Sequence, residues 1–451
     1  MKPLFAAVFS LFFAGPALAA TDIQTVETPM GFTAWLVEEP SIPFTSLEIR
    51  FAGGTSLDAP GKRGATNLMV GLLEEGAGER DARGFAEARD ALAASFRYDS
   101  GPDSISVSAR FLTENRDEAV ALLRESLVDP RFDEDALERV RAQVLSGIRS
   151  DARDPDAIAN ARFDEMVFGN HPYGSQPSGT EESVGALTRD DIVAAHEATM
   201  TRDRVYIAAA GDISPDALAT LIDDLLGDLP ATGAPLPADI EAETSAGVTV
   251  VPFDTPQSVA MFGHAGIARD DPDFFAAYVL NQILGGGGFE ARLMTEVREK
   301  RGLTYGVYSY LVPMDHSALY LGRVASSNDR IAEAISVIRD EWRKMAEDGV
   351  TEAELEQAVR EAGFIGYAIN SDQFKLSKLD GGNGITTSTQ VIDSQGNSHL
   401  AIFTAFRTED PNTWAWRMEL PDAANFAQDT GVDLGSNSQG LIEFNADGSI
   451  S

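Results

Sequence analysis

Apolar and polar residues alternate along several short segments of this chain, and helical spacing fills most of the stretches between them. Two alternating runs around Pro29-Met30-Gly31 predict a β-hairpin over Thr25–Glu38, and the alternation of Ser46–Phe51 predicts a further strand. More strands are predicted at 96–98, 104–111 and 205–209, and helices at about 62–75, 85–94, 114–128, 133–150, 155–167, 188–199 and 215–226. Because strands and helices do not alternate strictly, the pattern favours an α+β fold with helices on one face of an antiparallel sheet.

A break in this pattern marks a linker. Residues 231–246 are rich in Pro, Ala and acidic residues and have no hydrophobic period, and the apolar run Val248–Phe253 then predicts a new strand. We therefore expect a first domain over residues 21–230 and a second over residues 247–370.

These two domains are expected to be copies of one unit. A shift of 212 residues places identical residues on one another in the same strand–turn–helix context: Gly54 on Gly266, Asp58 on Asp270, Pro60 on Pro272, Ala65 on Ala277, Leu68 on Leu280, Leu72 on Leu284 and Gly76 on Gly288. Matches at this density and at one fixed offset indicate an internal duplication.

Charge and composition narrow the classes of partner. The chain has 451 residues, 43% of them hydrophobic, which is enough for two or three domain cores. Its 35 Lys and Arg against 71 Asp and Glu give a formal net charge of −36. That charge argues against nucleic acid and anionic lipid surfaces as partners, and it is compatible with general solubility or with binding basic peptides. The chain has no cysteine, so the fold relies on packing without disulfides.

The N-terminus has the three parts of a secretory signal peptide, predicted over residues 1–20. Lys2 supplies a basic start, Leu4–Phe13 is an apolar run too short to span a bilayer, and Ala17-Leu18-Ala19 offers a small-x-small cleavage site. No later stretch is long and apolar enough to cross a membrane. The mature protein is therefore expected in the periplasm or outside the cell.

Three stretches of the chain resemble the pitrilysin/insulinase family of inverted-motif zinc peptidases, in particular the short two-domain type that includes mitochondrial processing peptidase. They are Phe51–Asp58, Phe168–Gly174, and Leu284–Phe289 with the Arg292–Tyr305 region that follows it. The resemblance covers about residues 22–355 and implies two peptidase-like domains. In active members a helix after the Asp-x-Pro turn carries His-x-x-Glu-His, and a later Glu completes the zinc shell.

This chain has none of the residues that such a zinc site needs. The resemblance places the first His at Asn67, the Glu at Val70, the second His at Gly71 and the distal ligand near Ser146-Gly147. The five histidines of the chain are scattered, and no two lie a helical turn apart. The nearby carboxylates Glu74, Glu75 and Asp151 suit Mg or Ca better than a hydrolytic zinc. We expect no catalytic residues, no bound metal and no cofactor in this chain, with zinc only in a partner subunit.

The second half keeps a substrate-binding pair that the resemblance implies. In active relatives an Arg and a Tyr seven residues apart reach the substrate near the zinc, and Arg298 and Tyr305 occupy these positions. An Arg can clamp a peptide carbonyl or carboxylate, and a phenol can donate to a developing oxyanion. The alternative is structural: Arg298 pairs with Glu296 or Glu299 on a helix face, and Tyr305 begins a buried strand.

Residues 371–451 resemble a different protein, the middle β-domain of flagellar hook proteins. The matching stretches are Ile385–His399, Asn412–Trp416 and Ile442–Ser449, where short alternating runs are separated by turn residues. The second peptidase-like copy is therefore expected to be truncated, with an exposed sheet edge, and to be followed by a short all-β segment. Hook subunits normally leave through the flagellar export channel, which conflicts with the leader at residue 1 and indicates a gene fusion, frameshift or assembly product.

The favoured function is a non-catalytic subunit of a periplasmic zinc-peptidase heterodimer. It would contribute Arg298 and Tyr305 to the active site of a zinc-bearing homologous subunit that cleaves peptides. Two alternatives stay open: a flagellar hook-related structural fusion protein, and a stand-alone metallopeptidase with atypical ligands.

Overall fold

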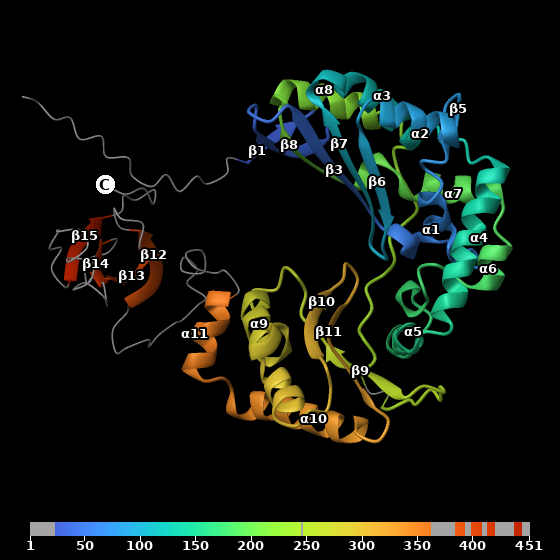
Figure 1. Ribbon diagram of the computed structural model, residues 1–451. Coiled ribbons are helices and arrows are strands. Elements are labelled where there is room, and N and C mark those ends of the chain that lie inside the picture. The colour runs from blue at the N-terminus through green and yellow to red at the C-terminus, as the bar shows by residue number, and fades with distance from the viewer. Residues whose placement is uncertain are drawn as a thin grey trace, which may run out of the picture. The chain divides into compact units, whose positions relative to one another are not determined.

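The structure, a computed structural model, describes residues 23–244 and 247–361 together with four strands of the C-terminal region (Figure 1). The predicted signal peptide, residues 1–20, lies outside the described residues. By internal contacts the chain divides into two compact units, residues 1–277 with 284–347 and residues 278–283 with 348–451.

A six-stranded sheet forms the centre of the N-terminal half. In spatial order its strands are β1 (Gln24–Glu27), β2 (Thr33–Glu38), β8 (Val205–Gly211), β3 (Phe44–Ala52), β7 (Ser104–Leu112) and β6 (Ser95–Ser100). All neighbours are antiparallel except β2 and β8, which run parallel. The predicted hairpin is confirmed, with Val26 opposite Ala34. Along β3 the alternate residues Thr45, Leu47, Ile49 and Phe51 are buried, because a strand presents successive side chains to opposite faces.

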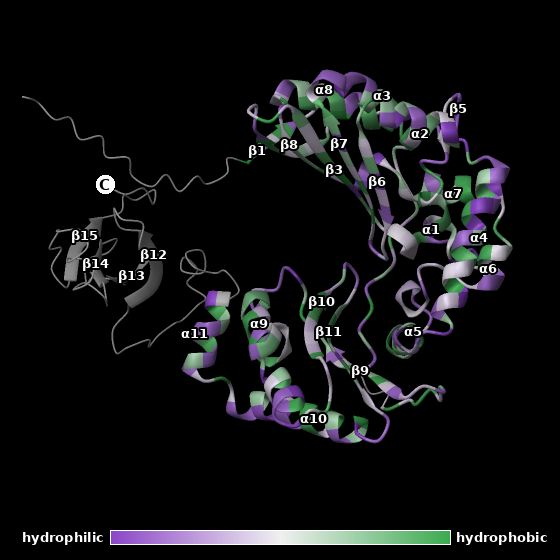
Figure 2. Cartoon of the chain, in the orientation of Figure 1, coloured by the Kyte–Doolittle hydropathy of each residue, from purple (hydrophilic) through white to green (hydrophobic). Residues whose placement is uncertain are grey.

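Helices cover one face of this sheet, which confirms the α+β prediction. Figure 1 shows α2 (Ala82–Ala91), α3 (Arg116–Val128) and α8 (Pro215–Leu226) on the same side of the strands. Figure 2 shows hydrophobic stretches on these helices toward the strands and hydrophilic ones away from them. The buried residues of α8, spaced as one helical face, are Leu218, Leu221, Ile222, Leu225 and Leu226.

The other helices of this half follow the sequence pattern closely. They are α4 (Glu134–Asp151), α5 (Pro155–Phe168) and α7 (Arg189–Thr199), and the short strands β4 (Gly76–Ala77) and β5 (Arg80–Asp81) form a separate pair. A five-residue helix, α6 (Glu181–Gly185), was not predicted. Its start is fixed by a capping box in which the Thr180 hydroxyl accepts from the Ser183 amide and the Ser183 hydroxyl accepts from the Thr180 amide.

The helix predicted at 62–75 is shorter in the structure, where α1 spans only Ala65–Val70. Gly64, with a φ of 96°, begins it in the left-handed region, which a β-carbon would disfavour. After Val70 the amides of Leu72 and Leu73 bond three residues back, so the chain tightens into turns. The apolar period of this segment predicted a longer helix because spacing of apolar residues carries no information on these backbone conformations.

The second half contains a three-stranded antiparallel sheet in the order β10 (Val307–Pro313), β11 (Ala318–Ser327), β9 (Gln257–Ala265). The indole ring of Trp342, on α10 (Ile331–Asp348), contacts Phe262 of β9 and Tyr320 of β11, so this helix packs on one face of the sheet. The strand predicted at Val248–Phe253 is wrong: the segment is irregular and exposed. The remaining helices are α9 (Phe274–Asn281), two π-helical segments (Gln282–Gly286 and Met294–Glu299) and α11 (Glu352–Glu361).

The C-terminal region contains a separate antiparallel sheet. Its strands, in both chain and spatial order, are β12 (Gly384–Ile392), β13 (Ser398–Arg407), β14 (Thr413–Glu419) and β15 (Asn437–Glu443). The prediction of an all-β segment after the peptidase-like copies is thereby confirmed. Among the helices described, none combines the length and apolarity needed to cross a membrane.

Candidate functional site

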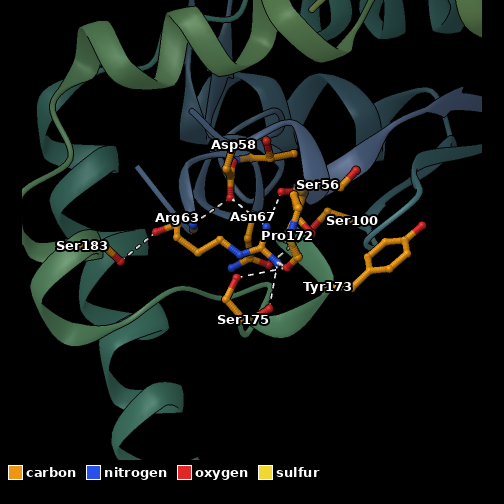
Figure 3. A network of polar contacts seen from close by, with 12 residues as sticks. Ser56, Asp58, Arg63, Asn67, Ser100, Pro172, Tyr173, Ser175 and Ser183 are labelled. Carbon is orange, nitrogen blue, oxygen red and sulfur yellow. Dashed lines mark hydrogen bonds and ion pairs between the residues drawn. The ribbon is translucent and has the colours of Figure 1, made fainter. Parts of the chain in front are cut away.

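The turn before α1 is held by the carboxylate of Asp58. One oxygen of Asp58 accepts from the amide of Gly64 and the other from the amide of Thr66, each at 2.8 Å. These amides belong to the first turn of α1, whose donors have no partner within the helix. Asp58 is thus the anchor that fixes the position of the helix (Figure 3). Burial raises the pKa of the Asp58 carboxyl, against the opposing effect of these hydrogen bonds and of Arg63.

Arg63 joins this turn to a loop more than a hundred residues away. Its guanidinium lies 3.5 Å from Asp58 and donates to the carbonyl oxygens of Thr55, Pro172 and Ser175 (Figure 3). The backbone oxygen of Arg63 accepts from the Ser183 hydroxyl at 2.8 Å. Burial lowers the pKa of Arg63, and the neighbouring Asp58 opposes that effect. The frame that positions α1 is therefore a closed network of polar contacts.

Asn67 and Val70 of α1 and Gly71 directly after it stand where a zinc peptidase needs its motif, and none of the three is a good metal ligand. The Asn67 amide oxygen accepts from the Ser100 hydroxyl at 3.3 Å. Val70 is 5% exposed and belongs to the hydrophobic core of this half. A β-carbon at Gly71 would lie 3.0 Å from Cγ1 of Val140, closer than ordinary van der Waals contact. The residues present do not fit a zinc ion, because two of the three positions carry no donor atom in the side chain.

The distal position is also without a ligand. Ser146 and Gly147 lie on exposed turns of α4, and Ser146 lines a shallow pocket of about 720 Å³ together with Arg149 and Arg153. The two carboxylates closest in sequence to α1 are engaged elsewhere: Glu74 pairs with Arg89, and Glu75 pairs with Arg139. A cationic arginine near a carboxylate disfavours metal binding there. Over residues 23–244 and 247–361, no group of three His, Cys, Asp or Glu side chains lies close enough together to hold a metal ion.

Three of the described histidines make separate structural contacts. His196 is buried and its Nε2 lies 2.8 Å from the carbonyl oxygen of Leu127, and burial lowers its pKa. His171 contacts Ala238, and His264 contacts the Trp342 indole. In each of the three, one ring nitrogen is already engaged with a neighbouring group of the protein.

Arg298 and Tyr305 lie near the end of the second π-helical segment and in the loop after it. The guanidinium carbon of Arg298 lies 4.7 Å from the centre of the Phe289 ring. Tyr305 is 88% exposed and precedes β10, so the alternative prediction that it begins a buried strand is wrong. Glu296 was one of the two predicted partners of Arg298. It pairs with Lys300 and Arg301 instead. Arg298 therefore takes no part in the ion pairs that Glu296 makes, and Tyr305 is exposed.

The fold and this site define a class of protein: a duplicated peptidase-like body without the residues of hydrolytic zinc. Residues 34–181 match the family model "Insulinase (Peptidase family M16)", and residues 186–362 match "Peptidase M16 inactive domain". The chain belongs to the M16 (insulinase) family. The predicted resemblance is confirmed.

Individual relatives agree with this assignment. The chain is 27% identical to the non-peptidase homolog YmxG of Helicobacter pylori over 76% of this chain and 78% of that protein. It is 29% identical to the uncharacterized zinc protease Mb2805c of Mycobacterium bovis over 76% and 78%. A solved structure from Pseudomonas fluorescens, described as a peptidase M16 inactive domain, is 30% identical, with a TM-score of 0.70 over 77% of this chain and 84% of that one.

Residues 368–451 match a further family model, "Flagellar basal body protein FlaE D2 domain". This confirms the predicted resemblance of the C-terminal region to hook proteins. The domain boundaries given by the sequence analysis stay a prediction.

Two features of the site escaped the sequence analysis. Phe289, beneath Arg298, follows a run of glycines and carries no local signal of its contact, which depends on how the π-helical segment turns. The second feature is a pocket of about 430 Å³ on the uncovered face of the six-stranded sheet, lined by Trp35, Glu48, Arg50, Ala52, Asp103, Tyr206, Ile207, Ala208 and Asp315. The outward positions of Trp35 and Tyr206 in their alternating strands are the signal that could have found it.

Proposed function

We propose that this protein is a non-catalytic subunit that assembles with a zinc-bearing homologue and presents Arg298 and Tyr305 to the peptide bound there. The observation that carries the proposal is the contrast between the two halves. The helix that should hold zinc carries Val70 in the core, whereas Tyr305 stands 88% exposed with Arg298 one short loop before it. The phenol of Tyr305 is open to solvent, and the Phe289 ring supports the guanidinium of Arg298 at the surface, so both groups are available to a ligand.

The chemistry of the pair suits a supporting role in peptide cleavage. A guanidinium presents several N–H donors in a fixed fork and binds a carbonyl or carboxylate with two of them. A tyrosine hydroxyl can donate to the oxygen on which negative charge develops during attack on a peptide carbonyl. The nucleophile and the metal would belong to the partner subunit. A location in the periplasm or outside the cell, proposed from the leader at residues 1–20, would place both subunits in one compartment.

Co-expression with a His-x-x-Glu-His homologue from the same genome tests this proposal. The two chains should co-purify, and the pair should cleave a peptide library faster than the homologue alone. Tyr305→Phe should lower kcat of the pair by about 100-fold, the usual effect of losing one donor to a developing oxyanion. The matched control is Tyr308→Phe, a second exposed tyrosine three residues on, which should leave kcat unchanged. Absence of co-purification together with no gain in cleavage would contradict the proposal.

The match of residues 368–451 to a flagellar domain supports a second candidate, a hook-related structural protein. Under that candidate the full chain should be found in purified hook–basal bodies. If the chain is absent from them and the co-expressed pair cleaves peptides, the subunit role is the candidate that remains.

A further inference from the structure

The sheet of the second half is an incomplete copy of the sheet of the first. Adding the 212-residue offset to β3 (44–52) gives 256–264, and β9 spans Gln257–Ala265. The same addition takes β6 (95–100) to 307–312, where β10 begins, and β7 (104–112) to 316–324, which overlaps β11. The shared order β3-β7-β6 is reproduced as β9-β11-β10.

Among the residues described, the copied sheet lacks counterparts of β1, β2 and β8, and the β8 position is the one directly beside β9. In the first half β8 lies between β2 and β3, parallel to β2 and antiparallel to β3. In the second half no described strand lies beside β9 on that side, so β9 is an edge strand. The described strands that follow α11 pair with one another in the order β12-β13-β14-β15.

The segment that corresponds to β2 in the second half is exposed. Adding 212 to β2 (33–38) gives 245–250, next to the apolar run Val248–Phe253. In the first half Ala34 and Leu36 of β2 are fully buried, whereas Val248 is 76% and Val250 is 79% exposed. β2 forms its ladder with β8 as well as with β1, and the run Val248–Phe253 lacks a neighbour equivalent to β8 among the described strands. The apolar pattern of this run predicts a strand, which a neighbour would have to pair.

β9 is also less buried than the corresponding strand of the first half. Its counterpart β3 buries Leu47, Ile49 and Phe51 almost completely, but no residue of β9 is buried to that degree. The amide of Gly266, directly after β9, donates to Ala318. Because amides of an antiparallel strand point alternately to its two sides, those of Val259 and Met261 face the open side. Among the described residues these amides have no strand partner, and they lie on the edge of the sheet.

We propose that β9 and the run Val248–Phe253 accept an extended strand from a second protein, which takes the place that β8 holds in the first half. The occupant runs antiparallel to β9. The first half shows its chemistry: β8 reads Val-Tyr-Ile-Ala-Ala-Ala-Gly and buries Ile207 and Ala209 while Tyr206, Ala208 and Ala210 face outward. A segment that presents an aliphatic or small residue, such as Ile or Ala, at every second position therefore fits. Main-chain hydrogen bonds supply affinity, as in other cases of strand addition to an open edge. This site is separate from Arg298 and Tyr305 and does not depend on the proposed function.

Binding of a synthetic strand to the purified full chain tests the inference. The probe is a fluorescent peptide with the sequence of residues 203–213, which contains β8, and the measurement is fluorescence anisotropy. We expect saturable binding with a Kd in the micromolar range. The same peptide N-methylated at alternate residues keeps its side chains but loses the donors of one edge, so it should not bind. Equal binding of the two peptides would overturn the inference, as would no binding of the first.

Two substitutions at one position complete the test. Val259→Pro removes an amide on the open side of β9 without removing a bond to β11, and we expect about tenfold weaker binding. Val259→Thr keeps the amide and is the matched control, with affinity unchanged. Circular dichroism reports whether the proline variant folds; if it does not, the N-methylated peptide decides. Sedimentation in the absence of peptide should show a monomer, and a dimer that Val259→Pro dissociates would overturn the inference by showing a second copy at this edge.

Discussion

The guanidinium of Arg298 lies over the ring of Phe289 with 4.7 Å between the guanidinium carbon and the ring centre. A cation above an aromatic face is stabilised by the ring quadrupole, and the flat contact limits the rotamers of the arginine. Phe289 is itself exposed. This contact therefore holds a charged group in one orientation at the surface, as a residue that must meet a substrate requires.

Phe289→Leu tests whether this orientation matters. The variant keeps an apolar side chain but removes the ring, so kcat/KM of the assembled pair should fall about two- to fivefold, the equivalent of 0.5–1 kcal/mol. Phe275→Leu, at another exposed phenylalanine, is the control and should have no effect. If Arg298→Ala reduces cleavage while Phe289→Leu does not, the ring has no positioning role.

Asp58 should be a major determinant of stability in the first half. Asp58→Ala leaves two amides of α1 without their acceptor and Arg63 without its counter-charge, so we expect the free energy of unfolding to fall by about 3 kcal/mol. Urea unfolding followed by circular dichroism measures it. The internal duplication provides a matched control: Asp270, the counterpart of Asp58, is exposed, and Asp270→Ala should change stability by less than about 0.5 kcal/mol. Equal effects of the two substitutions would contradict this account.

Restoring the motif at the α1 positions should not restore zinc binding. In the triple variant Asn67→His, Val70→Glu, Gly71→His, the new carboxylate enters the core position of Val70 and the new imidazole crowds Val140. We expect less than 0.1 zinc per chain by elemental analysis and a loss of about 3 kcal/mol or more in unfolding free energy. Val70→Met, which stays apolar, should cost less than about 1.5 kcal/mol. One tightly bound zinc per chain in the triple variant would contradict this expectation, because it would show that the core around Val70 and Val140 can rearrange to hold the metal ligands.

Tyr173 links the loop after α5 to the hairpin between β10 and β11. Its hydroxyl donates to the Asp103 carboxylate and accepts from the amide of His316 at 3.2 Å. Tyr173→Phe removes both bonds within a buried contact, and we expect a loss of about 1–3 kcal/mol and faster hydrogen exchange at the His316 amide. Tyr206→Phe, at an exposed tyrosine, should change neither quantity. Unaltered exchange at His316 in the Tyr173 variant would mean that the hairpin is held by other contacts.

Asp164 should make stability depend on pH. Burial raises the pKa of its carboxyl to about 6 from 3.8, although a hydrogen bond with Gln176 opposes the shift. Because the folded state holds the proton more tightly than the unfolded state, the contribution of this group is fully present below pH 3.8 and is lost as pH rises through 6. Asp164→Asn removes this dependence, so the difference in unfolding free energy between variant and wild type should grow in favour of the variant between pH 4 and 7. Urea titrations at pH 4, 5.5 and 7 measure it, and a difference that is constant with pH would contradict the assignment.

The sequence predicted regular elements where one physical signal was enough. The helix α8 was predicted at its observed bounds because Pro215 and the apolar period both define it, and β3 was predicted because its two faces differ so strongly in polarity. It failed where backbone conformation or a distant partner decides the outcome. The positive φ of Gly64 shortens α1, and Val248–Phe253 has the pattern of a strand without a described neighbour to pair with.

The amino-acid sequence by itself determined that this chain has no zinc motif, because no spacing of its residues supplies two imidazoles and a carboxylate on one helical face. It also determined the duplication, since one offset aligns the turn and helix of both copies. Only the tertiary structure decided that Val70 belongs to the core, that Arg298 rests on Phe289, and that β9 is the outer strand of its sheet among the residues described. Ligand chemistry is a property of residue types and their spacing, whereas burial, stacking and strand pairing depend on segments that meet only after the chain has folded.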